Sequence, residues 1–273
     1  MNAAHALWMF DFDNTLAPLE PAVDWPKSRR ELQAWLGGQG VAESLFEELP
    51  SGTLVLYETL RARLCAGGDA ARAVLARGEI ADILGNGHDV LSNGHNDGPA
   101  RGSGREAAAA AIRALLSGAS AIIERHELAR VSAVAPAPGA IELLRAIRAA
   151  GGSIAIVTSN SSRTVATWLK ARHAENLVDQ IVGRDSGLAL KPSPAMVYRA
   201  LEACAVAPAD AAFAGDSDAD FNAATAAAVR FYGINARAGG RQRLIALGAS
   251  PVFPSPSALS TYLDVPIDRA GNG

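Results

Sequence analysis

The pattern of apolar and polar positions changes character twice along the chain. Residues 7–12 form a short apolar and aromatic run, which predicts a buried strand. From residue 26 to about residue 130, apolar residues such as Leu32 and Leu36 recur at helical spacing, and this stretch predicts a series of helices. From residue 134 onward, short apolar runs alternate with helical segments. The helical stretch therefore interrupts a strand–helix series after its first strand.

The last part of the chain predicts a parallel sheet. Its predicted strands lie at 153–157, 180–183, 211–214 and 229–234, and its predicted helices at 138–150, 162–172, 194–203 and 218–227. Strands that alternate with helices in this way form parallel sheets covered by helices on both faces. We therefore expect an α/β fold, a Rossmann-like parallel sheet core with an inserted all-helical domain.

The boundaries of the insert follow from the same pattern. We assign residues 1–17 and 134–273 to a discontinuous α/β core and residues 18–133 to a helical cap. Within the cap, helices are predicted at 42–49, 53–64, 69–77 and 105–130. Residues 85–104 are rich in Gly, Asn, Asp and Ser and predict a long loop between two of these helices.

Composition narrows the class of protein. The 273 residues are 49% hydrophobic and carry a net charge of −3, which gives no general attraction to nucleic acid or to an anionic membrane. We find no apolar run approaching about 18 residues and no basic leader, and so expect no membrane span and a cytoplasmic location. Nothing in the pattern predicts an oligomeric state.

Four polar segments each follow a predicted strand of the core, and the carboxyl ends of parallel strands are where such sheets bind ligands. These segments are 11–15, 158–160, 191–192 and 215–220. The first holds two aspartates that are two residues apart, and the last holds two that are four apart at a helix start, so each pair shares one side. Crowded carboxylates require a cation, and a hard cation with oxygen ligands such as Mg²⁺ suits them. With Lys191 the rim becomes attractive to phosphate, which points to phosphoryl transfer with an Asp nucleophile.

These segments resemble the motifs of the haloacid dehalogenase (HAD) superfamily, in its phosphatase branch with a helical cap inserted after the first motif (the phosphoglycolate phosphatase-like branch). The resemblance rests on Phe-Asp-Phe-Asp-Asn-Thr-Leu at 10–16, Ile-Val-Thr-Ser-Asn at 156–160, Lys-Pro-Ser-Pro at 191–194, and Gly-Asp-Ser at 215–217 with Asp220. All four occur in the family order. The resemblance implies a Mg²⁺-dependent phosphoric monoester hydrolase that acts on a small phosphorylated substrate.

The resemblance also implies roles for single residues. Asp11 would be the nucleophile that becomes an aspartyl-phosphate, and Asp13 the general acid and then the general base. The expected phosphate- or substrate-binding residues are Thr158, Ser159, Asn160 and Lys191. The expected metal ligands are Asp11, Asp13 (through its backbone carbonyl), Asp216 and Asp220.

Other functions remain open at this point. A phosphomutase would use the same groups. Asn14 stands where many relatives have Gly and family nucleotidases often have Asn, so a 5′-nucleotidase is an alternative. A non-catalytic binding protein on the same fold is less favoured because Asp11, Asp13 and Lys191 are all present. As a structural alternative, Asp216 and Ser217 would only cap the following helix.

Overall fold

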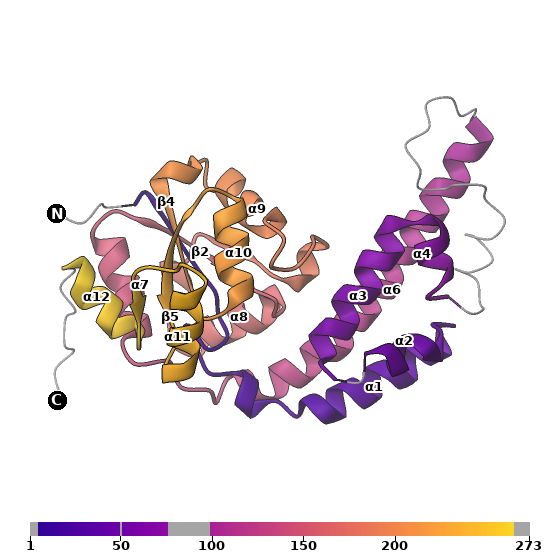
Figure 1. Cartoon of the computed structure of the whole chain (residues 1–273), viewed down its shortest axis with the longest axis horizontal. Helices are drawn as coiled ribbons and strands as arrows, with labels where there is room; N and C mark the ends of the chain where they lie inside the picture. The colour runs from indigo at the N-terminus through magenta and orange to yellow at the C-terminus, as the bar shows by residue number, and fades with distance from the viewer. Residues whose placement is uncertain (1–4, 50, 76–98, 265–273) are drawn as a thin grey trace. The chain divides into compact units, whose positions relative to one another are not determined.

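The computed structural model describes residues 5–49, 51–75 and 99–264, with the backbone alone over 99–105 (Figure 1). It separates into two compact units, one of residues 1–23 and 127–273 and the other of residues 24–126. The chain therefore leaves the first unit after its first strand and returns to it near the end of one long helix, α6 (Pro99–Val131).

The first unit is a six-stranded parallel sheet with strand order β3-β2-β1-β4-β5-β6, which confirms the predicted fold class. Its strands are β1 (Leu7–Phe10), β2 (Ser153–Val157), β3 (Gln180–Val182), β4 (Ala211–Gly215), β5 (Arg230–Ile234) and β6 (Val252–Phe253). The central strand β1 is buried along its whole length, as its apolar and aromatic sequence predicts.

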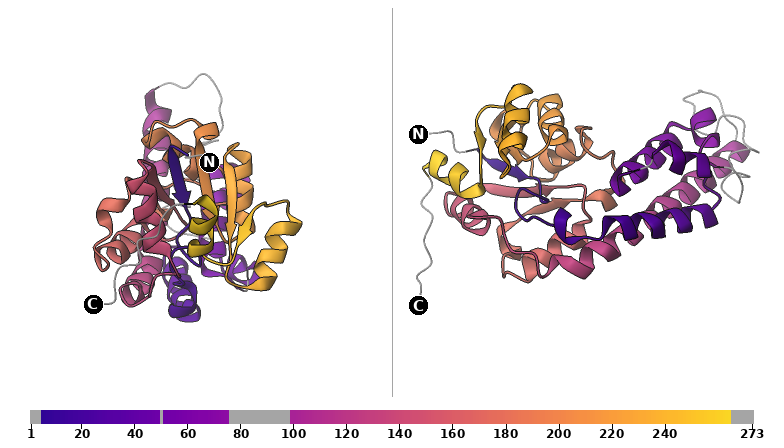
Figure 2. Two further views of the ribbon diagram at one scale, coloured as in Figure 1. Left: turned by 90° about the vertical axis from the view of Figure 1, so that its left-hand side faces the viewer. Right: turned by 60° about the horizontal axis from the view of Figure 1, so that its bottom comes forward.

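Helices cover both faces of this sheet, as the views of Figure 2 show. They are α7 (Ala140–Ala149), α8 (Ser162–Lys170), α9 (Ala195–Ala203), α10 (Asp218–Ala226), α11 (Ala238–Ala246) and α12 (Pro256–Leu263). Short 3₁₀ turns lie at Glu20–Ala22, Glu175–Leu177, Arg184–Ser186 and Pro208–Asp210. Helix α10 packs against α9 and α11, and α7 packs against α12. Right-handed crossovers between parallel strands place these two groups on opposite faces.

The strand order places a switch point beside β1. The chain moves outward from β1 through β2 to β3, and then crosses back to start again at β4 on the other side of β1. Ligands of open parallel sheets bind outside the carboxyl ends of the strands at such a point. The residues that directly follow β1 and β4 are therefore the first place to look for a site.

The second unit is helical in the residues that the structure describes. Its helices are α1 (Trp25–Gly38), α2 (Glu43–Glu48), α3 (Thr53–Ala66), α4 (Gly68–Arg72) and most of α6. Helix α1 begins after Asp24, whose side chain accepts a hydrogen bond from the N–H of Lys27. A Cβ atom at Gly118 would lie 2.5 Å from the Trp35 ring, so a glycine is needed where this indole meets α6.

Helix α6 begins six residues earlier than predicted. Residues 99–104, expected to close the loop over 85–104, are its first turns, and the rest of that loop lies outside the described residues. Over Glu106–Val131 the helix is long and apolar enough to span a membrane by length and composition. Core helices pass the same test, and Ile112, Leu115 and Ile123 are buried within the protein.

Candidate active site

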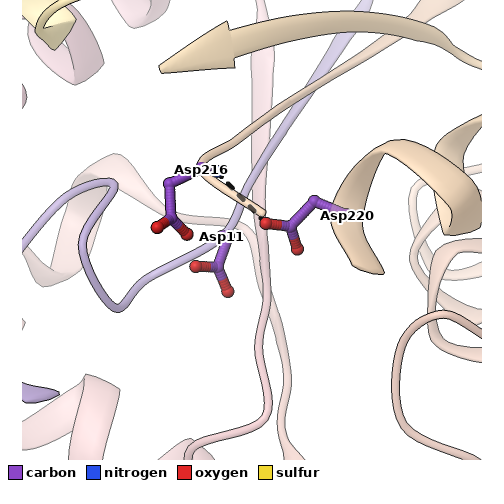
Figure 3. Close-up of side chains that lie close together, drawn as sticks. All are labelled: Asp11, Asp216 and Asp220. Atoms are coloured by element: carbon purple, nitrogen blue, oxygen red, sulfur yellow. Dashed lines mark hydrogen bonds between the residues drawn. The ribbon is translucent and has the colours of Figure 1, made fainter. Parts of the chain in front are cut away.

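Three carboxylates meet at the switch point of the sheet (Figure 3). Asp11 follows β1 directly, Asp216 follows β4, and Asp220 lies in the first turn of α10. One oxygen from each lies within 4.8 Å of the other two. The N–H of Asp11 donates to the carbonyl of Ala214 at 2.9 Å, which extends the β1–β4 pairing into the site. Residues 205 positions apart are thus brought together by the sheet, as the sequence predicted.

Lys191 lies against this cluster. Its Nζ is 2.5 Å from Asp11 Oδ1 and 2.6 Å from Asp220 Oδ1, and it donates to the carbonyl of Val157 at 3.0 Å. The contacts with Asp11 and Val157 are hydrogen bonds, and the contact with Asp220 Oδ1 is an ion pair. Burial alone would lower the pKa of Lys191, but the two carboxylates outweigh it and raise the pKa. Lys191 is therefore a fixed positive charge at the carboxyl ends of β1 and β2.

Besides its contact with Lys191, Asp220 orders the start of α10, which we did not predict from the sequence. Its Oδ2 accepts hydrogen bonds from the N–H groups of Asp216 (3.1 Å) and Ser217 (3.0 Å) and from the Ser217 hydroxyl (2.7 Å). Ser217 in turn caps α10 through the N–H of Asp220, which completes a capping box. A Cβ at Gly215 would lie 2.6 Å from Asp220 Cβ, so the carboxylate can approach this closely only because residue 215 is glycine.

The helix-cap alternative is thus correct for Ser217, but it does not account for Asp216. Both oxygens of Asp220 already have partners within the protein, whereas the side chain of Asp216 faces the cluster. Asp218 forms an ion pair with Arg243 at the surface. The polar side chains of this segment therefore make different contacts, and that of Asp216 is the one that faces the cluster without a protein hydrogen bond described above.

The cluster carries more negative charge than its surroundings neutralise. Burial, with the nearby carboxylates adding to it, raises the pKa of Asp216 to about 8. Burial likewise raises the pKa of Asp11 to about 6, although Lys191 opposes the shift. A divalent cation would remove both penalties, and a set of carboxylate oxygens is what Mg²⁺ prefers. The residues present therefore fit a magnesium ion, with Asp11 and Asp216 as the side chains best suited to hold it.

Asp13 lies outside this cluster and has a different environment. Its Oδ1 accepts a hydrogen bond from the N–H of Glu20 at 2.8 Å, in the turn that follows the first motif. Burial, with repulsion from Asp11 and Glu20, raises the pKa of Asp13 to about 7. A carboxyl group whose pKa lies near neutrality can both give and take a proton, as a general acid and base must.

Asn14 has a structural reason to be asparagine. Its φ is 58°, in the left-handed region that Asn adopts more readily than most residues. Its side chain donates to Glu20 Oε2 at 2.9 Å, and its N–H donates to the carbonyl of Ala17. The residue thus shapes the tight turn after Asp13, and the structure explains it without a nucleotide.

The segment after β2 contains three of the predicted phosphate- or substrate-binding residues, and the structure places them differently. Thr158 lies at the carboxyl end of the strand, buried next to Val157, whose carbonyl binds Lys191. Ser159 is half-buried. Asn160 is 2% exposed, and its side chain bonds Thr158 and Glu127 instead of facing outward. These two hydrogen bonds show that Asn160 supports the loop, and its predicted role in lining the substrate site stays a prediction.

Three supporting residues were not singled out from the sequence. Asn235, just after β5, donates to the carbonyl of Asp216 at 2.9 Å. Glu127 and Arg184 form a buried ion pair beneath the loop after β2. Asn235 and Arg184 both lie just after the carboxyl end of a strand, at the edge of the sheet that holds the site. Their position after a predicted strand could therefore have marked them in the sequence.

An open parallel sheet with a lysine and an acidic cluster at its switch point defines a class of α/β protein. A sequence profile described as haloacid dehalogenase-like hydrolase matches residues 111–234, which include Thr158, Lys191, Asp216 and Asp220. The match covers less than half of the chain, and over residues 111–234 it confirms the resemblance to the haloacid dehalogenase superfamily seen in the sequence.

The curated relatives that match the chain are phosphoglycolate phosphatases. Over 126 residues the chain is 33% identical to a phosphoglycolate phosphatase of Pseudomonas putida, covering 46% of this chain and 44% of that protein. Over 154 residues it is 31% identical to phosphoglycolate phosphatase 1 of Pseudomonas aeruginosa, covering 56% and 54%. The chain thus spans about half the length of these curated relatives. A crystal structure of a predicted phosphoglycolate phosphatase from Haemophilus somnus shares the fold, with a TM-score of 0.50, 18% identity, and coverage of 96% of this chain and 100% of that one.

Proposed function

We propose that this protein is a Mg²⁺-dependent phosphatase that hydrolyses a small phosphorylated metabolite through an aspartyl-phosphate on Asp11. The observation that carries the proposal is the placement of Asp11 at the switch point, with Lys191 Nζ 2.5 Å from its carboxylate. The similarity to phosphoglycolate phosphatases supports the same reaction class.

In the first step, a carboxylate oxygen of Asp11 attacks phosphorus and the bond from phosphorus to the ester oxygen breaks. Asp13, whose pKa of about 7 leaves part of it protonated near neutrality, gives its proton to the leaving oxygen. Lys191 neutralises charge on the phosphoryl oxygens, aided by the hydroxyl of Thr158, whose single proton turns from the Asn160 amide oxygen to a phosphoryl oxygen. A bound magnesium ion, held by Asp11 and Asp216, would add positive charge beside the phosphoryl group.

In the second step, Asp13 is a carboxylate and takes a proton from water. That water attacks phosphorus, the bond between phosphorus and the Asp11 oxygen breaks, and phosphate leaves. Asp11 returns to a carboxylate and Asp13 to its acid form, so the cycle closes without another reactant. Asp220 takes no part in bond changes; it holds Lys191 and the backbone of Asp216 in place.

The first test is phosphate release from an aryl phosphate with and without Mg²⁺. We expect turnover only with the metal, and none for Asp11→Asn. Asp218→Asn is the matched control, since it removes an acidic group of the same segment that pairs with Arg243 away from the cluster. Equal turnover in Asp11→Asn and wild type would contradict the proposal.

The second test concerns the metal without turnover. Calorimetric titration with Mg²⁺ should give one site in the wild type and in Asp218→Asn, and no site in Asp216→Asn. A ligand that binds only the folded state at 100 times its Kd stabilises the protein by about 2.7 kcal/mol, so the melting temperature should rise in parallel. Unchanged binding in Asp216→Asn would remove this residue from the metal site.

We further propose that the second unit, residues 24–126, acts as a cap that selects the substrate. A panel of phosphorylated metabolites tests the substrate class, beginning with phosphoglycolate because the relatives carry that name, and including sugar phosphates and nucleoside monophosphates. We expect kcat/KM to favour a small phosphorylated acid over a nucleotide. A preference for nucleotides would contradict this choice and favour the nucleotidase alternative.

A further inference from the structure

A fully buried ion pair lies beside the loop that follows β2. Glu127, in the last turns of α6, accepts a hydrogen bond from Arg184 Nη1 at 2.9 Å, and both side chains are 0% exposed. Arg184 opens the 3₁₀ turn after β3. Both residues belong to the first unit, although they are 57 positions apart in sequence.

The Glu127 carboxylate binds more than the arginine. It accepts hydrogen bonds from Asn160 Nδ2 (3.0 Å), from the N–H of Ser161 (3.3 Å) and from the Thr164 hydroxyl (2.8 Å). Burial opposes ionisation of Glu127, but Arg184 and these donors outweigh it and lower its pKa. Every partner other than Arg184 lies on the loop after β2 or on the first turn of α8.

This carboxylate determines which way the Asn160 amide faces. An ionised carboxylate only accepts hydrogen bonds, so the amide nitrogen must face Glu127 and the amide oxygen must face away. That oxygen accepts a hydrogen bond from the Thr158 hydroxyl at 3.1 Å, and the N–H of Asn160 donates to the same Thr158 oxygen at 3.1 Å. The position of the Thr158 hydroxyl is therefore connected to Glu127 through one amide group.

Arg184 holds the backbone of the same loop from its other side. Its Nη1 donates to the carbonyl of Ser159 at 2.7 Å, and its N–H donates to the carbonyl of Asn160 at 2.8 Å. A Cβ at Gly183 would lie 2.9 Å from the carbonyl oxygen of Asn160, so the two backbones pack without space between them. Between them, Glu127 and Arg184 contact Ser159, Asn160 and Ser161, and Asn160 holds Thr158.

We propose that Glu127 and Arg184 are positioning residues that fix the Thr158 loop for binding the phosphoryl group. The inference rests on the proposed function and adds two residues to it that touch neither substrate nor metal. Stability alone is a weak reason for such a pair, since well-packed apolar residues often replace buried ion pairs without loss. Position is a stronger reason, because a displacement of about 1 Å at a catalytic group can cost about 100-fold in rate.

The test is a double-mutant cycle with Glu127→Gln and Thr158→Val, read as kcat/KM for an aryl phosphate well below the melting temperature. We expect Glu127→Gln to lower kcat/KM by about 100-fold in the wild-type background. In the Thr158→Val background we expect it to lower kcat/KM by less than about fivefold, because residues that act through one another are not additive. Equal factors in the two backgrounds would overturn the proposal.

The matched control is Asp179→Asn. Asp179 also pairs with an arginine, Arg148 at 2.8 Å, and also accepts a backbone N–H, that of Ile154 at 2.8 Å, but it does so at the start of β2. It should lower the melting temperature and leave kcat/KM within about twofold. Should Glu127→Gln fail to fold, Arg184→Lys takes its place in the cycle, since it keeps a charge while losing the arginine's bond to Ser159. If kcat/KM of Arg184→Lys equals that of Asp179→Asn, the positioning role is refuted.

Binding of inorganic phosphate by calorimetry separates this proposal from the proposed function. We expect Glu127→Gln to weaken phosphate binding at least tenfold while Asp179→Asn does not. A wild-type chain that neither turns over nor binds phosphate would overturn both proposals. An active wild type whose Glu127→Gln variant matches Asp179→Asn in rate and phosphate affinity would overturn the positioning role alone.

Discussion

Replacing Lys191 with arginine keeps the positive charge and changes only its shape, so it tests whether position matters. The Nζ atom sits between Asp11 and Asp220 at 2.5 and 2.6 Å and bonds the Val157 carbonyl at 3.0 Å, with a side chain 4% exposed. A planar guanidinium has no room to make these three contacts in the same place. Overpacking a buried position costs about 1–3 kcal/mol.

The effect on rate should be larger than the effect on stability. Loss of one preorganised group that stabilises transition-state charge costs about 100- to 1,000-fold in kcat. Because arginine retains the charge but not its position, we expect Lys191→Arg to lower kcat by about 100-fold, the lower end of this range. Lys191→Met should be worse, since it removes the positive charge between two buried carboxylates.

The assay is aryl phosphate turnover at saturating substrate and Mg²⁺, with thermal melting to show that each variant is folded. Lys170→Arg is the matched control, because Lys170 is exposed on the last turn of α8 in the same unit. It should leave kcat and the melting temperature unchanged. If kcat of Lys191→Arg lies within threefold of this control, the compact ammonium has no special role.

Three further outcomes are expected. Asp13→Asn should slow aryl phosphate hydrolysis by about 100- to 10,000-fold, the usual contribution of general acid–base catalysis, and a near wild-type rate would exclude Asp13 from proton transfer. The pKa of Glu127 lies below the ordinary 4.5, so its charge stabilises the folded state fully above about pH 4.5 and less as the pH falls through the lower folded-state pKa. Urea unfolding against pH should show this acid loss in wild type and a shallower slope in Glu127→Gln; identical slopes would contradict it. Gly183→Ala should lower stability by about 1–3 kcal/mol in urea, because its Cβ would lie 2.4 Å from the N–H nitrogen of Ser162, and an unchanged midpoint would show that the backbone adjusts freely.

The sheet and the gathering of the four motifs were predictable because both depend on local signals. An apolar run marks each strand from β1 to β5, although not the two-residue β6. Parallel topology then carries the residues after β1, β2 and β4 to one edge without further information. Lys191 was expected among them from its motif, and the structure adds that one ammonium contacts both Asp11 and Asp220.

The supporting contacts were not predictable, because nothing local marks them. Glu127 lies in a helix whose sequence reads as Ala-rich, and its partner Arg184 is 57 residues away. The sequence likewise marked Asn160 as a polar residue at a strand end but not the direction of its amide, which depends on Glu127. The start of α6 was misplaced by six residues because Gly and Ser at 102–104 favour a loop by propensity, a preference that the helix overrides.

The scarcity of lysine has a practical consequence. The chain contains three lysines, and Lys191 is buried as a bound ammonium that an amine-reactive reagent cannot reach. The other two, Lys27 and Lys170, are exposed, and one lies in each compact unit. An amine-reactive label can therefore be attached to one lysine side chain in each unit without mutating the protein. Fluorophores at these two points would report the distance between the units in solution as substrate is added.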